Sequence, residues 1–341
     1  MKMVEKIFVV GILGAGRIGK IHAANCAQIP GVRIKTIVDL KVDGLKDFAA
    51  KLGVQKLSTD PKDIFGDPEI NAVLICSSTD THAKFIVEAA KAKKDVFCEK
   101  PIDYDIKRIK DTLAAVDKAG VKLMIGFNRR FDHNHKRVRD AVVNGEIGKV
   151  HIVKVTSRDP SPPPIEYVKV SGGLFFDMTV HDWDILAYLA GEEIVEVYAA
   201  GGVLVDPKIG QAGDIDTAAV VVKFKSGAMG LVDNSRQAVY GYDQRTEVFG
   251  SKGGAWVDND FPNMAKVYND KVVAGDKMHF FFLERYMGSY QAELKEFFDC
   301  LANNKKPSVG GIDGLNAVLV ATAAKKSLDE NRPVKISEIK A

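Results

Sequence analysis

The sequence predicts an α/β protein in which a doubly wound parallel sheet is followed by an α+β part with a large, mostly antiparallel sheet. Three observations support this prediction. A length of 341 residues suggests two domains. Short apolar runs alternate with helical stretches up to about residue 126, and later apolar or period-2 runs follow one another without helices between them. We therefore expect one domain over residues 1–126 and a second over residues 127–341.

The composition is that of an ordinary soluble globular protein, with 46% hydrophobic and 27% charged residues. A net charge of +3 gives no field that would favour nucleic acid or a membrane as partner. The 4 cysteines include no C-x-x-C pair, which argues against a metal site or a disulfide framework and fits a reducing compartment. We therefore expect a cytoplasmic protein without a bound metal.

The first strand–turn–helix unit carries a nucleotide-binding pattern. Lys6–Leu13 predicts a buried strand and Lys20–Gln28 a helix, and Gly14-Ala15-Gly16-Arg17-Ile18-Gly19 stands between them as G-x-G-x-x-G. In this pattern the first glycine allows the tight turn, the second lets a pyrophosphate approach the backbone, and the third lets helix and strand pack closely. The helix N-terminus then offers N–H groups to the phosphates.

An acidic residue completes this unit. The next strand, Arg33–Val38, ends at Asp39, which lies 20 residues after Gly19. An acidic side chain there accepts hydrogen bonds from ribose hydroxyls and repels a 2′-phosphate, so we expect a Rossmann domain that binds NAD. A glycine-rich turn without a ligand is the alternative. Lys41 argues against a strict preference for NAD, because a cation near this position could tolerate the 2′-phosphate of NADP.

The alternation continues through helix 43–52, strand 70–76, helix 83–91, strand 95–98, helix 106–119 and strand 122–126. A loop over residues 77–82 follows the strand at the edge where ligands bind such sheets. His82 is either a cofactor-side residue or a cap of the following helix. The residues expected to contact the cofactor are Gly14, Gly16, Arg17, Ile18, Asp39, Ser77, Thr79, His82, Glu99 and Lys100.

A lysine stands directly before a proline in Glu99-Lys100-Pro101, at the end of the strand that begins at Asp95. Proline disfavours the α region for the residue before it, so Lys100 is held extended. A cation fixed at the end of a parallel strand points into the ligand crevice. Taken alone, the segment could equally be a surface lysine before a loop proline.

The second part begins with helix 134–143 and a strand from Gly148 to Thr156. Further strands are expected over 194–205, 217–224, 228–237, 245–249, 254–259 and 265–268, as parts of one largely antiparallel sheet. Helices over 284–303 and 311–330 close the chain.

A carboxylate and an imidazole stand four residues apart after Gly172-Gly173. If the run onward to Leu189 is one helix, Asp177 and His181 share a face. A carboxylate one turn from an imidazole can fix its tautomer, which suits a general base for an alcohol. A buried pair that only satisfies itself and a metal-ligand pair are the alternatives, although no second ligand cluster supports the metal.

Together these motifs resemble the Gfo/Idh/MocA oxidoreductases, most closely the inositol 2-dehydrogenases, over essentially the whole chain. The resemblance implies NAD as cofactor, a cis Lys100–Pro101 bond and a homotetramer assembled through the second-domain sheets. It implies Lys100, Asp177 and His181 as the catalytic residues. It also suggests that Arg130, Asp159 and Tyr240 lie near the substrate together with the catalytic residues, although Arg129, Tyr242 or Tyr286 could serve instead.

The expected reaction is oxidation of a secondary hydroxyl of a cyclic polyol, myo-inositol to 2-keto-myo-inositol, by hydride transfer to the nicotinamide. His181 would accept the hydroxyl proton while Lys100 stabilises the developing alkoxide. The choice of inositol rests on the resemblance alone. A dehydrogenase of another inositol isomer or a pyranose, an enzyme that recycles a tightly bound nicotinamide, and a non-catalytic NAD-binding sensor are the alternatives.

Overall fold

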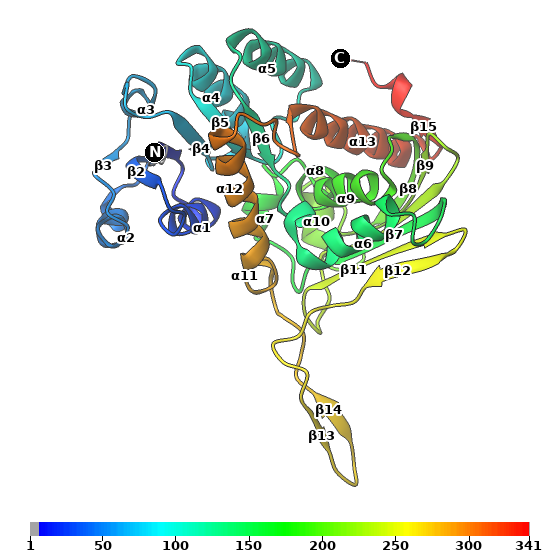
Figure 1. The fold of residues 1–341 in the computed structure, drawn as a ribbon. Coiled ribbons are helices and arrows are strands. Elements are labelled where there is room, and N and C mark those ends of the chain that lie inside the picture. Colours follow the sequence, from blue (N-terminus) through cyan, green and yellow to red (C-terminus); the bar gives the residue numbers. More distant parts are fainter. Residues whose placement is uncertain (1–6, 341) are drawn as a thin grey trace. The chain divides into compact units, whose positions relative to one another are not determined.

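The computed structural model describes residues 7–340, which form two compact units (Figure 1). The first unit runs to Asn128 and also takes in Gly288–Asn316. The second comprises Arg129–Met287 and Ala317–Lys340. The grouping thus differs from the expected division into 1–126 and 127–341, because a late helical segment belongs to the first unit. The assignment of the two parts to cofactor and substrate stays a prediction.

The first unit contains a six-stranded sheet in which every pairing is parallel, in the order β3-β2-β1-β4-β5-β6. The strand order reverses between β1 and β4, and ligands bind such sheets beyond the carboxyl ends of the strands at this point. The expected doubly wound sheet is therefore confirmed. Its strands are β1 (Phe8–Leu13), β2 (Val32–Val38), β3 (Lys56–Ser58), β4 (Ala72–Ile75), β5 (Asp95–Glu99) and β6 (Leu123–Gly126).

Helices flank this sheet, and three of them differ from the sequence-based expectations. α1 begins at Arg17, three residues before the expected start at Lys20. The helix expected over 43–52 is a 3-10 turn followed by a short helix, and α4 begins four residues before the expected start at Ala83. Thr79 and His82 therefore lie in the first turn of α4 instead of in a loop. Lys6, the expected start of β1, lies outside the described residues. The helices are α1 (Arg17–Cys26), η1 (Asp43–Leu45), α2 (Lys46–Lys51), α3 (Lys62–Phe65), α4 (Thr79–Lys91), α5 (Ile106–Ala119) and α12 (Met287–Ala302).

The second unit contains a seven-stranded sheet in the order β12-β11-β7-β10-β9-β8-β15. Only the β7–β10 pairing is parallel, which confirms the expected large, mostly antiparallel sheet. Its strands are β7 (Val150–Arg158), β8 (Ile194–Gly202), β9 (Thr217–Phe224), β10 (Met229–Ser235), β11 (Asp243–Gly250), β12 (Gly253–Val257) and β15 (Val334–Lys335).

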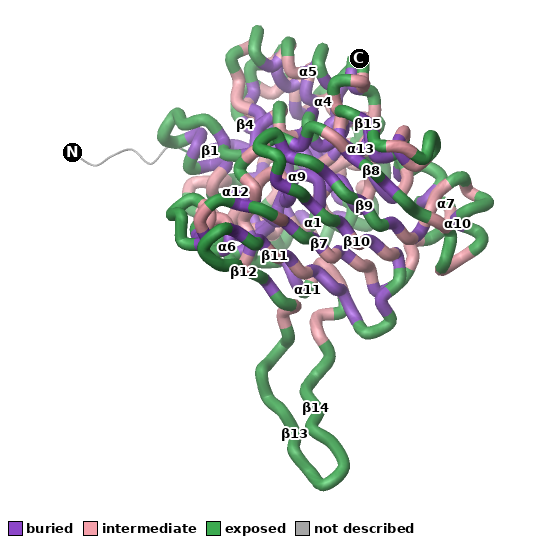
Figure 2. Tube along the Cα trace, turned by 90° about the vertical axis from the view of Figure 1, so that its right-hand side faces the viewer, coloured by how far each residue is buried: buried purple, intermediate pink, exposed green. Residues whose placement is uncertain are grey.

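One expected strand of this sheet lies elsewhere. The run expected over 265–268 forms β13 (Lys266–Tyr268), which pairs only with β14 (Val273–Gly275) in a separate two-stranded hairpin. The hairpin is exposed along its whole length (Figure 2). Its sequence alternates as a sheet strand does, so the local pattern could not distinguish the two arrangements.

Helices cover one face of the large sheet, with α9 packed against β7 and α6 packed against α9. The long helix expected over 284–303 is broken after Arg285, whereas the one expected over 311–330 is present with those bounds and continues from the first unit into the second. Helices of the second unit are α6 (His133–Val143), α7 (Ile165–Val168), α8 (Leu174–Asp177), α9 (Val180–Ala190), α10 (Pro207–Gln211) and α11 (Phe282–Arg285), while α13 spans Gly311–Glu330. Short 3-10 turns are η2 (Asn128–Phe131) and η3 (Ile336–Glu338).

The opposite face of the sheet is open. Strand residues alternate between buried and exposed, as in Val197 and Tyr198 of β8. The strand register places six residues with exposed or half-buried side chains in one row across this face: Tyr198, Val221, Leu231, Lys154, Glu247 and Trp256.

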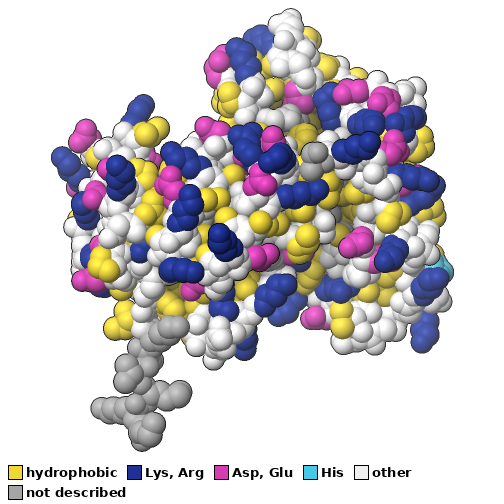
Figure 3. All heavy atoms as spheres, turned by 90° about the horizontal axis from the view of Figure 1, so that it is seen from above, with side chains coloured by type: hydrophobic (Ala, Val, Ile, Leu, Met, Phe, Trp, Pro, Cys, Tyr) yellow, Lys and Arg dark blue, Asp and Glu magenta, His cyan; other side chains and the backbone are white. Residues whose placement is uncertain are grey.

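Charged side chains of both signs are interspersed on the face of the molecule drawn in Figure 3. This agrees with the small net charge of the sequence. Among the described residues, no helix is both long and apolar enough to cross a membrane.

Candidate active site

The glycine turn of the first unit leaves its backbone open at one position. A Cβ at Gly14, where φ is +90°, would lie 2.6 Å from the carbonyl oxygen of Cys76, and a Cβ at Gly19 would lie 2.0 Å from that of Gly14. A Cβ at Gly16 would meet nothing within 4 Å. The N-cap residue of the helix that begins at Arg17 is Gly16, which has no side chain to cap it. The turn therefore fits a pyrophosphate, which needs close access to the backbone and free N–H groups.

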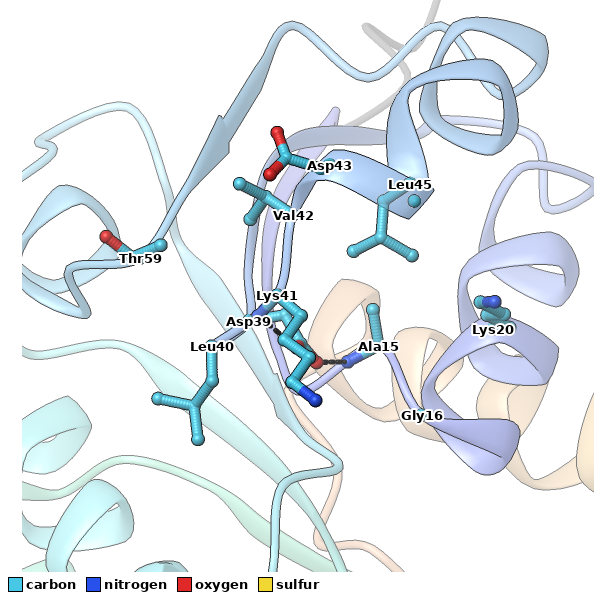
Figure 4. A pocket seen from close by; sticks show the side chains of 11 residues that line it. Ala15, Gly16, Lys20, Asp39, Leu40, Lys41, Val42, Asp43, Leu45 and Thr59 are labelled. Carbon is cyan, nitrogen blue, oxygen red and sulfur yellow. Dashed lines mark hydrogen bonds between the residues drawn. The ribbon is translucent and has the colours of Figure 1, made fainter.

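Asp39 lies at the end of β2 beside this turn (Figure 4). Its Oδ2 accepts a hydrogen bond from the backbone N–H of Ala15 at 2.7 Å, and its Oδ1 accepts one from the N–H of Lys41 at 2.9 Å. An ionised carboxylate has about four lone-pair sites, so Asp39 can still accept from two ribose hydroxyls. The side chain of Lys41 extends along the same cavity in Figure 4.

The cavity at Asp39 has a volume of about 650 Å³, within the usual range for a site that holds a small molecule or part of a cofactor. It is lined by Ala15, Gly16, Lys20, Asp39, Leu40, Lys41, Val42, Asp43, Gly44, Leu45 and Thr59. Among the expected cofactor residues, the structure thus brings together Gly16 and Asp39.

The segment Glu99-Lys100-Pro101 follows β5, and the Lys100–Pro101 peptide is cis, as the resemblance implies. The ring of His82 holds this segment. Its Nδ1 lies 2.8 Å from the carbonyl oxygen of Pro101, and its Nε2 lies 3.0 Å from that of Ser77. His82 therefore connects the turn after β4 to the turn after β5.

The surroundings of His82 favour a structural role for its ring. The ring is buried, burial lowers the pKa of its imidazole, and both ring nitrogens face backbone carbonyls. No ring nitrogen is left for a direct hydrogen bond to a cofactor, and neither nitrogen caps α4. His82 thus joins the loops around Ser77 and Lys100, and its expected contact with the cofactor stays a prediction. Ser77 itself pairs its hydroxyl with that of Thr81 at 2.6 Å.

In the second unit, the premise of one continuous helix through Asp177 and His181 is wrong. Asp177 is the last residue of α8, whereas His181 is the second residue of α9. Met178 and Thr179 separate the two helices, and the Thr179 hydroxyl bonds the carbonyl of Leu174 at 3.1 Å and the side-chain oxygen of Asn234 at 2.7 Å. A buried threonine with tertiary partners thus breaks the helix. The orienting of His181 by Asp177 stays a prediction.

Asp177 accepts hydrogen bonds from two side chains that no pattern in the sequence connects with it. The hydroxyl of Tyr167 donates to its Oδ1 at 2.8 Å, and Nη1 of Arg236 donates to its Oδ2 at 3.2 Å. The guanidinium of Arg236 is 1% exposed and also lies 3.6 Å from Oδ2 of Asp214. The polarity of a single arginine after an alternating strand is the only sequence signal that marks Arg236.

Asp159 follows β7, and Arg236 follows β10, the parallel neighbour of β7. The carboxyl ends of these two strands meet at one edge of the sheet, where the backbone N–H of Asp159 bonds the carbonyl of Ser235 at 2.9 Å. Burial raises the pKa of Asp159 to about 6, while the positive charge of Arg236 opposes this shift. A carboxyl with such a pKa in a polar site is a candidate for contact with substrate hydroxyls.

The remaining expected substrate residues have other partners. Arg130 donates from Nε to Oδ2 of Asp184 at 2.8 Å, and from Nη2 to Oδ1 at 2.5 Å. Tyr240 is 42% exposed, and its hydroxyl donates to Oδ2 of Asp243 at 2.7 Å. These contacts favour an indirect role for Arg130 and Tyr240.

The three alternatives to these residues are buried. Arg129 donates to Oδ1 of Asp182 at 2.5 Å, and Tyr242 and Tyr286 pack edge to face with ring centroids 6.0 Å apart. Asp182 accepts a further bond from Nδ2 of Asn234 at 2.8 Å. Arg129, Asp182 and Asn234 thus form a connected polar network that joins α9 and β10, and of these three the sequence had offered Arg129 as a substrate-side alternative.

Comparison with known proteins decides the family. Residues 8–127 match the oxidoreductase family with an NAD-binding Rossmann fold, and residues 135–256 match the GFO/IDH/MocA C-terminal domain. The chain belongs to the Gfo/Idh/MocA oxidoreductase family. The expected cofactor, NAD, and the expected class of NAD-dependent dehydrogenase are thereby confirmed.

Relatives within the Gfo/Idh/MocA family align along nearly the full length. The chain is 50% identical to myo-inositol 2-dehydrogenase of Thermotoga maritima over 97% of this chain and 99% of that protein. It is 42% identical to inositol 2-dehydrogenase of Rhizobium meliloti, covering 96% and 98%. The crystal structure of scyllo-inositol dehydrogenase from Lactobacillus casei with bound NAD(H) and scyllo-inositol matches with a TM-score of 0.91 at 30% identity, covering 97% and 100%.

Proposed function

We propose that this protein oxidises a secondary hydroxyl of myo-inositol, giving 2-keto-myo-inositol, with NAD as the hydride acceptor. The observation that carries the proposal is the 50% identity, along 97% of the chain, to an enzyme named myo-inositol 2-dehydrogenase. The polar residues around Asp159 and Asp177 support it, since a substrate rich in hydroxyls needs several donors and acceptors.

In the proposed mechanism, the oxidised nicotinamide supplies the acceptor for a hydride from the substrate carbon. The hydroxyl of that carbon loses its proton to His181 as the carbonyl forms. The ammonium of Lys100 donates a hydrogen bond to the same oxygen and stabilises the negative charge that develops on it. Lys100, Asp177 and His181 thus form the acid–base set, with the part of Asp177 being to orient His181.

Asp159 is the substrate residue that the structure supports best. It is half-buried at the strand edge beside Arg236, and desolvation raises the pKa of its carboxyl to about 6. We propose that Asp159 forms a hydrogen bond with a substrate hydroxyl, the one on a ring carbon adjacent to the reacting carbon. Arg130 and Tyr240 then act indirectly, by holding Asp184 and Asp243.

We also propose that the enzyme is a cytoplasmic homotetramer whose subunits associate through the open face of the large sheet. Apolar side chains exposed on β8 to β12 of this face include Tyr198, Val221, Met229, Leu231, Phe249 and Trp256. Exposed apolar side chains gathered on one sheet face, interrupted here by the charged Lys154 and Glu247, are typical of a subunit interface. The hairpin of β13 and β14 adds exposed apolar side chains, among them Met264, Val267 and Tyr268. An isolated two-stranded hairpin is marginal in water, so contact with another subunit would stabilise it.

A second candidate substrate is scyllo-inositol, because a structure of a scyllo-inositol dehydrogenase matches the whole chain. The test is a comparison of kcat/KM for myo-inositol, scyllo-inositol, glucose and galactose with NAD. We expect myo-inositol to give the highest value. An aldose that exceeds every inositol by more than about tenfold, or ~1.4 kcal/mol in transition-state binding, would refute the inositol assignment and leave a dehydrogenase of pyranoses. Failure to reduce NAD with any polyol would favour an NAD-binding sensor.

A further inference from the structure

A buried acid–base cluster lies directly behind the strand end that carries Lys100. It consists of His22 on α1, Glu99 at the end of β5 and Glu293 on α12, all within the first unit. Nε2 of His22 lies 2.7 Å from Oε1 of Glu99 and 4.0 Å from Oε1 of Glu293. One nitrogen or oxygen atom from each of the three side chains lies within 4.8 Å of the other two.

The cluster is closed to solvent. The side chains of His22 and Glu293 are 0% exposed and that of Glu99 is 12% exposed. Phe97 and Tyr290 pack edge-on against the imidazole, with ring centroids 5.0 and 5.8 Å away. Among the described residues, neither carboxylate oxygen of Glu293 has a hydrogen-bond partner. Glu293 is therefore a deeply buried carboxyl aimed at a histidine that is already paired.

Charge balance decides how many protons the cluster holds. Oε1 of Glu99 lies 2.7 Å from Nε2 of His22. A carboxylate and a protonated imidazole at this distance form a pair with no net charge. An ionised Glu293 would then be a buried charge without a close partner, which is very costly. Burial and the negative charge of Glu99 raise the pKa of Glu293 well above its usual value, and Glu296 on the same helix adds to this.

The other titratable groups nearby do not compensate for that charge. Cys26, Cys76 and Cys98 lie on α1, after β4 and on β5, and burial raises the pKa of each thiol, so all three are neutral at pH 7. In the described part of the chain, His22 is the only basic side chain within 4.0 Å of Glu293, and Glu99 is nearer to it.

The carboxyl of Glu99 contacts His22 on one side and strand β6 on the other. A Cβ at Gly126 of β6 would lie 3.2 Å from the carboxyl carbon and both oxygens of Glu99. The side chain is thus held between α1 and β6, and Lys100 is the next residue. A change of charge in the cluster acts first on Glu99 and, through the peptide that joins them, on Lys100.

We propose that His22, Glu99 and Glu293 form a proton-holding cluster in which Glu293 stays protonated at neutral pH, and that this cluster positions Lys100 for catalysis. His22, Glu99 and Glu293 are positioning residues in this scheme, because none of them is assigned a contact with the reacting atoms. The effect on turnover rests on the proposed role of Lys100, whereas the protonation of Glu293 does not.

Infrared spectroscopy of the full-length protein tests the protonation directly. At pH 7 we expect a carbonyl stretching band of a protonated carboxylic acid that shifts on labelling with ¹³C-glutamate and disappears in Glu293→Gln. Glu296→Gln, one turn further along α12, is the matched control and should keep the band. Absence of the band in the wild type, or its persistence in Glu293→Gln, would overturn the proposal. The proposal would also be overturned if the dialysed wild type held one equivalent of metal and dialysed Glu293→Gln held none.

Kinetics then test the positioning role. Glutamine mimics the protonated acid, so Glu293→Gln should keep NAD affinity and lose far less than the ~10²-fold in kcat that removal of an acid–base group costs. In the wild type, kcat should fall at alkaline pH as Glu293 ionises, and this decline should be absent in Glu293→Gln. An identical pH profile in both proteins would refute the positioning role. If the infrared band is present but no polyol is oxidised, the cluster stands and the proposed function fails.

Discussion

Arg236 donates a hydrogen bond from Nη1 to Oδ2 of Asp177 at 3.2 Å, from a guanidinium that is 1% exposed. The same cation lies 3.6 Å from Asp214, so it balances two carboxylates that are far apart in the sequence. Asp177, the proposed partner of His181, is thus fixed by a residue at the end of β10.

Replacing Arg236 with Met should destabilise the protein. The change removes the guanidinium from beside Asp177 and Asp214, and breaking a buried ion pair costs about 3–5 kcal/mol. The free energy of unfolding from urea titration measures this loss. Arg137→Met removes an exposed pair with Glu146 and should change the free energy of unfolding little, because solvent screens exposed pairs. Equal losses in the two variants would show that Arg236 does not hold the site together.

Lys100→Met and His181→Ala should each keep NAD binding but lose most turnover. The physical reason is that groups which transfer or stabilise a proton contribute ~10²–10⁴-fold to the rate. Stopped-flow measurement of NADH formation and fluorescence titration of NADH separate the two effects. Lys110→Met, at an exposed position of α5, serves as control. Near-native kcat in either variant would remove that residue from the acid–base set.

Asp39→Ala should weaken NAD binding and reduce the preference of the enzyme for NAD over NADP. The carboxylate lies beside the glycine turn, where it can accept ribose hydroxyls and repel a 2′-phosphate. Lys41 extends along the same cavity, so Lys41→Ala should instead strengthen the preference for NAD. The measurement is the ratio of kcat/KM for the two cofactors. Equal use of both cofactors by the wild type would show that Lys41 outweighs Asp39.

Asp159→Asn should change how stability depends on pH. The pKa of Asp159 in the fold is about 6, against an ordinary value of 3.8, so the folded state binds the proton more tightly than the unfolded state. This contribution to stability is present below about pH 4 and is lost as the pH rises through 6. Its size is on the order of 2–3 kcal/mol.

The matching experiment is urea unfolding from pH 4 to 8. We expect the decline assigned to Asp159 to be absent in Asp159→Asn, while Asp140→Asn, at an exposed position of α6, keeps it. An unchanged pH dependence in Asp159→Asn would mean that this carboxyl is ionised throughout. The acid limb of kcat/KM should shift in the same variant if Asp159 contacts the substrate.

Leu231→Asp should dissociate the proposed tetramer. Leu231 lies in the exposed row between Val221 and Lys154 on the open sheet face, and an interface there would have to bury the new charge. Light scattering after size-exclusion chromatography gives the mass. Val143→Asp, also exposed but at the end of α6, should leave the mass unchanged. A wild type that elutes as a monomer would refute the tetramer.

Much of the first unit could be predicted because its signals are local. The turn from Gly14 to Gly19 and the acidic residue after β2 are set by a few neighbours along the chain. Buried parallel strands also read as apolar runs, so their order along the chain was predictable. The boundary errors, such as the early start of α4, lie within a few residues of helix ends.

The second unit was less predictable where tertiary contacts override the local pattern. The spacing of Asp177 and His181 predicted one helical face, but the bonds of Thr179 to Leu174 and Asn234 break the helix between them. The alternating run that ends at Tyr268 fitted the large sheet equally well, and only the pairing with β14 placed it in a hairpin.

The sequence by itself determined the dinucleotide-binding turn, the choice of Asp39 and the candidate acid–base residues, since each depends on residue type and spacing along the chain. Only the tertiary structure decided which buried charges meet. His22, Glu99 and Glu293 come from three separate elements, as do Asp177, Asp214 and Arg236. Such clusters leave no periodic signal, because each member is one polar residue among apolar neighbours. Burying an unpaired charge is unfavourable, and only the folded chain brings together the partners that offset this free energy.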